Sequence, residues 1–137
     1  MANIALLTAA RVDPEESIDQ QTKNAAVDID AGQAIHEDAN GNWALASAAN
    51  AAGAAGVYLA THKVRAGGGL TGLRLGVFYG FNLAALAFNA PIYLSDTPGA
   101  IADAAGTVSV LLGRVTSARA VTFGSAKDKI LKIACPI

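Results

Sequence analysis

The fold of this chain is decided by the stretch Ala90-Pro-Ile-Tyr-Leu-Ser-Asp-Thr-Pro-Gly-Ala-Ile-Ala-Asp-Ala-Ala-Gly-Thr-Val-Ser-Val-Leu-Leu-Gly-Arg-Val-Thr-Ser-Ala118. Ile92-Tyr93-Leu94 is a short β-favouring run, and residues 95–99 are Ser, Asp, Thr, Pro and Gly, which are typical of turns. Residues 107–110 then alternate polar and apolar side chains before a second apolar run. The stretch therefore predicts strand, turn, short strand, turn and strand, and it contains no cluster of reactive side chains.

Turn signals and short apolar runs continue along the rest of the chain. Asn40-Gly41 is a strong tight-turn signal suited to positive φ, and Trp43-Ala44-Leu45 begins the return strand. Residues 63–71 include three consecutive glycines and predict a loop before another strand-like run. The pattern predicts about eight to ten short strands and no long apolar period of 3.6 residues. We therefore expect a mainly β protein, a small β-sandwich or barrel (jelly-roll-like), rather than an α/β fold.

The N-terminal residues differ in character from the rest. Residues 1–24 hold a small apolar patch, made of Ile4, Leu6 and Leu7, and then a proline-containing polar segment without a sustained hydrophobic period. Segments of this kind often order on a partner. We expect an extended N-terminal arm over residues 1–24, disordered in the isolated protein, and a β-domain over residues 25–137.

Small side chains dominate the apolar composition. Hydrophobic residues make up 53% of the 137 residues, whereas aromatic residues make up only 6%. Because small side chains bury little apolar area each, an alanine-rich monomer would gain stability from contacts with other copies. Eight acidic and two basic residues give residues 1–40 a net charge of −6, and eight basic and three acidic residues give residues 41–137 a net charge of +5. These two parts could pair across subunits, pair within one fold, or stay solvated.

No motif predicts catalysis, and we expect neither a cofactor nor a metal ion. Residues 67–72 match the G-x-G-x-x-G pattern, but a strand-like run rather than a helix follows, so a hairpin loop is favoured over phosphate binding. His, Glu and Asp at residues 36–38 precede a turn and predict a solvated hairpin tip rather than a metal site. Asp96 and Asp103 lie in turn contexts, which leaves a hydrolase as the weakest of the alternatives.

The cysteine count, the N-terminal residues and the distribution of charge bear on where the protein is found and on whether it binds membranes or nucleic acid. Cys135 is the only cysteine, so no intramolecular disulfide can form. The first residues lack the basic lead of a secretion signal, and the uncharged residues 43–61 are too weakly apolar for a membrane span, so we expect a soluble protein. Basic residues are scattered and the pI is near 6.0, which argues against nucleic-acid binding.

Three segments resemble the decoration, or cement, proteins that coat tailed-bacteriophage capsids. They are Ile29-Asp-Ala-Gly-Gln-Ala-Ile35, Ile92-Tyr-Leu-Ser-Asp-Thr-Pro-Gly99 and Val110-Leu-Leu-Gly-Arg-Val115. Each segment is short, and their order and spacing carry the likeness, which spans residues 25 to 134. The resemblance implies a structural virion protein that binds the outer surface of the capsid and stabilises the shell, with no enzymatic activity.

The same resemblance implies the partners and the location. The partners would be the major capsid protein and other copies of the chain, in a homotrimer with a dimer as the alternative, without nucleic acid or membrane. The protein would lie on the outer capsid surface of the virion and would pass through the host cytoplasm during assembly.

Eight residues are candidate protein contacts, four from the expected arm and four from a run that holds half of the chain's aromatic residues. They are Ile4, Leu6, Leu7, Arg11, Phe78, Tyr79, Phe81 and Phe88. Aromatic side chains are favoured in interface cores, but these rings could equally form the core of the domain itself. The alternative function is a carbohydrate- or receptor-binding β-module of a phage fibre or tail, for which Trp43 is the candidate aromatic platform.

Overall fold

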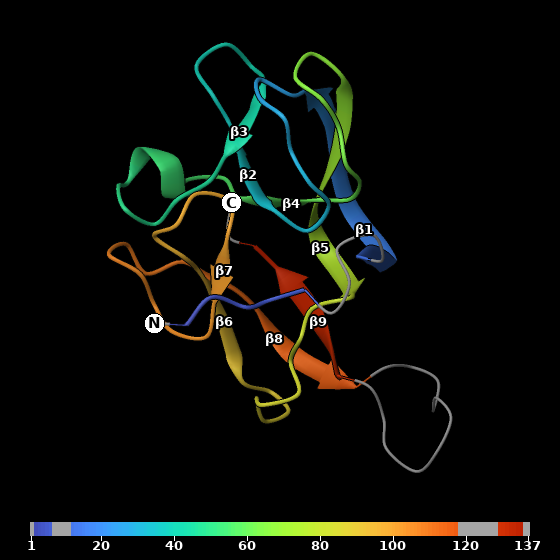
Figure 1. Ribbon diagram of the computed structural model, residues 1–137, viewed down its shortest axis with the longest axis vertical. Helices are drawn as coiled ribbons and strands as arrows, with labels where there is room; N and C mark the ends of the chain where they lie inside the picture. The colour runs from blue at the N-terminus through green and yellow to red at the C-terminus, as the bar shows by residue number, and fades with distance from the viewer. Residues whose placement is uncertain (1, 7–11, 118–128, 136–137) are drawn as a thin grey trace.

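The structure, a computed structural model, describes residues 2–6, 12–117 and 129–135 (Figure 1). These residues form nine strands and one 3₁₀ turn, Ala52–Ala54. The strands are β1 (Asp13–Asn24), β2 (Ala34–Glu37), β3 (Trp43–Leu45), β4 (Tyr58–Ala60), β5 (Gly69–Tyr79), β6 (Pro91–Leu94), β7 (Ile101–Ala102), β8 (Leu111–Ser117) and β9 (Lys129–Ala134). The expected mainly β fold is confirmed, and none of the helical turns described is long and apolar enough to cross a membrane.

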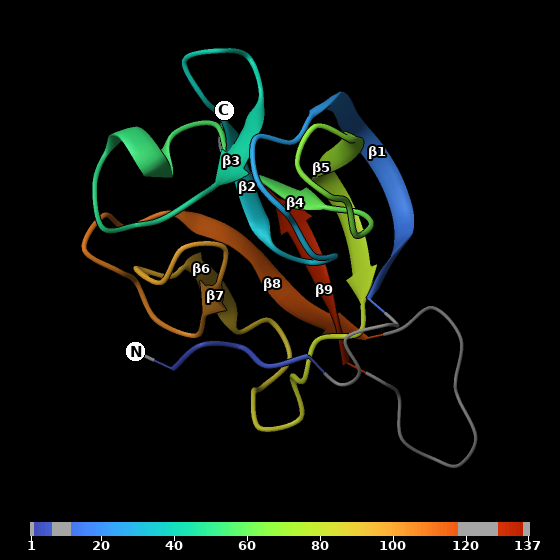
Figure 2. The ribbon, with the colours of Figure 1, turned by 45° about the horizontal axis from the view of Figure 1, so that its top comes forward.

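All the strands belong to one antiparallel sheet that is organised around β5. Along one edge, β5 pairs first with β4 at residues 72–73 and then with β9 at residues 75–78, while β1 follows its other edge. The full order is β3-β2-β4-β5-β9-β8-β6-β7. Figure 2 shows this sheet curling from β1 and β5 on the right, through β9 and β8, to β6 and β7 on the lower left.

The two ends of the curled sheet are joined by backbone hydrogen bonds. The backbone N of Ala34 donates to the carbonyl oxygen of Gly99 at 2.9 Å, and the backbone N of Gly99 donates to Ala46 at 2.8 Å. Ala48 donates likewise to Ser95 at 2.9 Å. These bonds satisfy backbone groups that would otherwise be unpaired at the sheet ends. The result is a half-barrel, in agreement with the small barrel or sandwich expected from the strand pattern.

Small residues let the strands approach closely around the core. Seven alanines are buried among the described residues, and six of them belong to the larger or to the smaller of the buried apolar clusters. A Cβ on Gly72 would lie 3.1 Å from both Ile35 Cδ1 and Trp43 Cζ2, and therefore only glycine fits this position of β5 without displacement. Most of the buried apolar side chains form two clusters. The main cluster contains Phe78 and Leu112, and the smaller one contains Ile35 and Trp43.

β1 corrects the secondary structure expected for residues 13–24. The segment was expected to be irregular, but it pairs antiparallel with β5, from Asp13 opposite Tyr79 to Asn24 opposite Gly69. Register shifts interrupt the pairing three times. A mostly polar strand has no alternation of apolar and polar residues, so its sequence does not reveal it. Residues 7–11 lie outside the described residues, and the domain boundary at residue 24 stays a prediction.

Candidate functional site

The two carboxylates considered for hydrolysis each accept hydrogen bonds from another part of the chain. Asp96 accepts hydrogen bonds from the backbone N and from the hydroxyl of Thr107, both at 2.8 Å. Asp103 accepts one from the backbone N of Ala2 at 3.0 Å. Aspartate is commonly used in this way to hold turns and chain ends. Both side chains therefore have a structural role in this fold.

The glycine-rich loop and the acidic turn both belong to hairpins. Because β5 begins at Gly69, a strand follows Gly67, and the loop lacks the helix N-terminus on which phosphate binding of this type depends. Asp38 accepts hydrogen bonds from the backbone N of Asn40 at 2.9 Å and of Asn42 at 3.0 Å. Within the described ranges, no three His, Cys, Asp or Glu side chains gather closely enough to hold a metal ion.

Cys135 lies at the end of β9 and is only 2% exposed. Burial raises the pKa of its thiol to about 12, and the positive charge of Arg74 opposes this shift. Arg74 is itself hydrogen-bonded to Asp19 of β1, and this bond raises the pKa of the guanidinium group. Since the thiolate is the reactive form of cysteine, Cys135 is a poor nucleophile and acts as a small apolar core residue.

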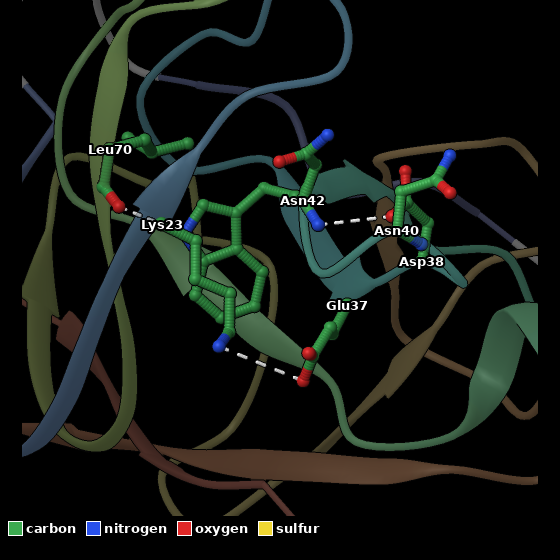
Figure 3. A network of polar contacts seen from close by, with 7 residues as sticks. Lys23, Glu37, Asp38, Asn40, Asn42 and Leu70 are labelled. Carbon is green, nitrogen blue, oxygen red and sulfur yellow. Dashed lines mark hydrogen bonds and ion pairs between the residues drawn. The ribbon is translucent and has the colours of Figure 1, made fainter.

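Trp43 is fully buried and cannot serve as an exposed platform for a sugar. Figure 3 shows the ion pair between Lys23 and Glu37 that lies beside it. The Nε1 of Trp43 donates a hydrogen bond to the carbonyl oxygen of Leu70 at 2.8 Å, and the ring of Tyr58 lies 5.0 Å away between centroids. The ammonium group of Lys23 on β1 lies 5.7 Å from the ring centroid and 3.7 Å from a carboxylate oxygen of Glu37. This network joins β1 to the β2–β3 hairpin, so Trp43 has a structural role.

The structure separates the aromatic contact candidates into two groups. Phe78 and Phe81 are buried and pack edge to face with centroids 6.2 Å apart, so both belong to the core of the domain. Tyr79 and Phe88 remain on the surface, with 39% and 52% of their area exposed. Of the aromatic residues that the sequence singled out, only these two can meet another molecule without rearrangement.

Of the four N-terminal residues that are candidate protein contacts, Ile4 and Leu6 lie against the domain. The backbone N of Ile4 donates to the carbonyl oxygen of Ile101 at 2.8 Å, so residues 3–4 lie beside β7, whereas Leu6 pairs with Phe81. Ile4 and Leu6 are half-buried and line a cavity of about 140 Å³ together with Phe81 and Ile101. Leu7 and Arg11 lie outside the described residues. In this structure the apolar patch therefore contributes to the domain's own packing.

Two basic side chains from β8 and β9 hold the loop between β5 and β6. Lys129 Nζ donates to the carbonyl oxygens of Ala84 and Leu86 and lies 5.2 Å from the ring centroid of Phe88. Arg114 Nη1 donates to the carbonyl of the residue after Phe88 at 3.0 Å. Sequence reasoning missed both contacts, because their partners lie 25 or more positions away and no local pattern links them. The loop thus presents Phe88 on a backbone with fixed carbonyl groups.

Comparison with known proteins adds no relative to this picture, since no protein-family model matches the chain and no curated protein matches it significantly.

Proposed function

We propose that this chain is a capsid decoration protein of a tailed bacteriophage. In this role it binds the outer surface of the shell, contacts the major capsid protein and other copies of itself, and performs no chemistry. A homotrimer is the assembly we favour, and the virion surface is its location after assembly in the host cytoplasm.

One observation carries the proposal. The first of the three segments that resemble decoration proteins is far from the other two in the sequence, yet all three form one hydrogen-bonded unit. Ile92 pairs with Gly113 between β6 and β8, and Ala34 donates to the carbonyl oxygen of Gly99 at 2.9 Å. The likeness therefore follows the framework of the fold rather than scattered surface positions. This supports a shared architecture with the proteins that the segments resemble.

The geometry of the surface fits a role in contacts between macromolecules. Asp96 and Asp103 hold backbone groups, and the Cys135 thiol stays protonated. Phe88 is the most exposed aromatic side chain in the described part of the chain, and Lys129 holds its loop in place. A protein that binds only the assembled shell stabilises that state by mass action, so many weak contacts suffice.

Binding to shells tests the proposal directly. Purified protein is mixed with expanded shells and with unexpanded shells reconstituted from the major capsid protein of the same phage, and both are sedimented and imaged. We expect decoration of the outer surface of expanded shells and greater resistance of these shells to heat. Absence of the protein from both kinds of sedimented shell would refute the proposal.

A further inference from the structure

The tip of the β2–β3 hairpin holds a chemically labile dipeptide in a tightly bonded turn. The backbone N of Asp38 donates to Asn42 at 2.8 Å, and the backbone N of Gly41 donates to the carbonyl oxygen of Asp38 at 3.1 Å. Gly41 has a φ of +80°, whereas Asn40 is not in the left-handed region. The sequence had suggested positive φ for this pair, and the observed turn needs it only at Gly41, as in a hairpin with a glycine bulge.

Asn40 is the only asparagine of the chain that precedes a glycine, and its side chain is exposed. In an Asn-Gly pair the backbone N of the glycine can attack the side-chain amide carbon, since no side chain hinders its approach. The new N–C bond forms as the amide nitrogen leaves with a proton as ammonia. Water then opens the cyclic imide to aspartate or isoaspartate, and no oxidant or reductant is required.

We propose that Asn40 is a site of spontaneous deamidation whose rate in the folded protein is held down by Asp38. The attacking nitrogen, that of Gly41, is engaged with the Asp38 carbonyl oxygen. The Asp38 carboxylate also binds the backbone N on both sides of Gly41, in Asn40 at 2.9 Å and in Asn42 at 3.0 Å. Reaction requires Gly41 to leave this arrangement, so the turn must first open.

Conversion of Asn40 would change the turn that leads directly to the buried Trp43. Aspartate or isoaspartate adds a negative charge to a turn that already contains Glu37 and Asp38, and isoaspartate also lengthens the backbone within the turn. Trp43 lies directly after the turn, is the only tryptophan of the chain, and is fully buried with its Nε1 bonded to Leu70. Its fluorescence therefore reports whether modification at the tip disturbs the hairpin.

The test follows deamidation in the full-length protein at mildly alkaline pH by peptide mass mapping and isoaspartate detection. We expect Asn40 of the folded wild type to convert about tenfold more slowly than Asn40 of the same chain unfolded in denaturant, because a backbone hydrogen bond must open first. Asp38→Ala should raise the rate several-fold, and Asp38→Asn, which keeps an acceptor oxygen, should remain slow. Asn50, which precedes alanine, is the internal reference.

Circular dichroism and Trp43 fluorescence verify that each variant is folded before the rates are compared. If Asp38→Ala does not fold, the comparison of folded and unfolded wild type and the Asp38→Asn rate decide the matter. Equal rates for folded and unfolded wild type would overturn the proposal. So would a folded Asp38→Ala variant with the wild-type rate, or an Asp38→Asn variant that converts as fast as the unfolded chain.

Discussion

Replacement of Phe88 by alanine tests whether the β5–β6 loop is the surface through which copies of the chain meet. The side chain is 52% exposed. An aromatic side chain of about 200 Å² thus leaves about 100 Å² for a partner to cover, which contributes about 2.5 kcal/mol at 25 cal/mol per Å². Since 1.4 kcal/mol corresponds to a factor of ten, we expect Phe88→Ala to weaken self-association roughly 60-fold. The fold should lose only the contact with Lys129, about 0.5–1 kcal/mol.

Two further variants separate an interface effect from an effect on folding. Phe81 is only 3% exposed, so Phe81→Ala should cost about 3–5 kcal/mol of folding stability, and a loss of association in that variant says little about the interface. Leu111, which is 40% exposed on β8, provides the matched control, and Leu111→Ala should leave association nearly unchanged. Circular dichroism establishes that each variant is folded.

Sedimentation of each variant at about 0.1 M and about 1 M salt completes the experiment. Exposed ion pairs contribute about 0–1 kcal/mol each and are strongly screened at the higher salt, where the Debye length is about 3 Å. We therefore expect salt to weaken association only slightly. Unchanged association of Phe88→Ala would refute the reasoning, and dissociation of the wild type by salt alone would show that charges hold the copies together.

Four other outcomes are expected. Trypsin should cut slowly after Lys23 in the isolated protein, because this residue pairs with Leu70 and contacts Trp43; rapid cutting would favour the disordered arm that the sequence suggested. The Cys135 thiol should resist alkylation in the native state at pH 8. Because its pKa is raised from 9.0 to about 12 by folding, the protonated thiol's contribution to stability is complete below pH 9 and declines as pH rises toward 12. The wild type should therefore lose about 1.4 kcal/mol more than Cys135→Ala between pH 8 and pH 10, measured by urea unfolding, and equal losses would contradict the burial argument. Alanine at His36 or His62 should preserve heat resistance in shells that carry the protein, and a loss of resistance with normal incorporation would reveal a site that geometry does not show.

The local parts of the fold could be read from neighbouring residues. Ile92-Tyr93-Leu94 and the turn residues after it predicted β6, and Trp43-Ala44-Leu45 after Asn40-Gly41 predicted the return strand β3. These signals are short-range, because alternation along a strand and the backbone preferences of turn residues act within a few positions. β1 carries no such signal, since its polar side chains give no alternation, and its pairing with β5 was not anticipated.

Sequence alone therefore determined that this is a mainly β protein in which small residues supply most of the apolar content. It did not predict the lengths of β1 and β5, which have 12 and 11 residues instead of being short, and β5 includes residues 69–71, which were expected to be loop. Only the tertiary structure decided which aromatic residues face solvent: Phe78 and Phe81 are buried in the core, while Phe88 is held at the surface beside Lys129. It also decided that Trp43 is covered by Lys23. The physical reason is that burial depends on contacts between residues far apart in the chain, and those contacts exist only once the sheet has curled.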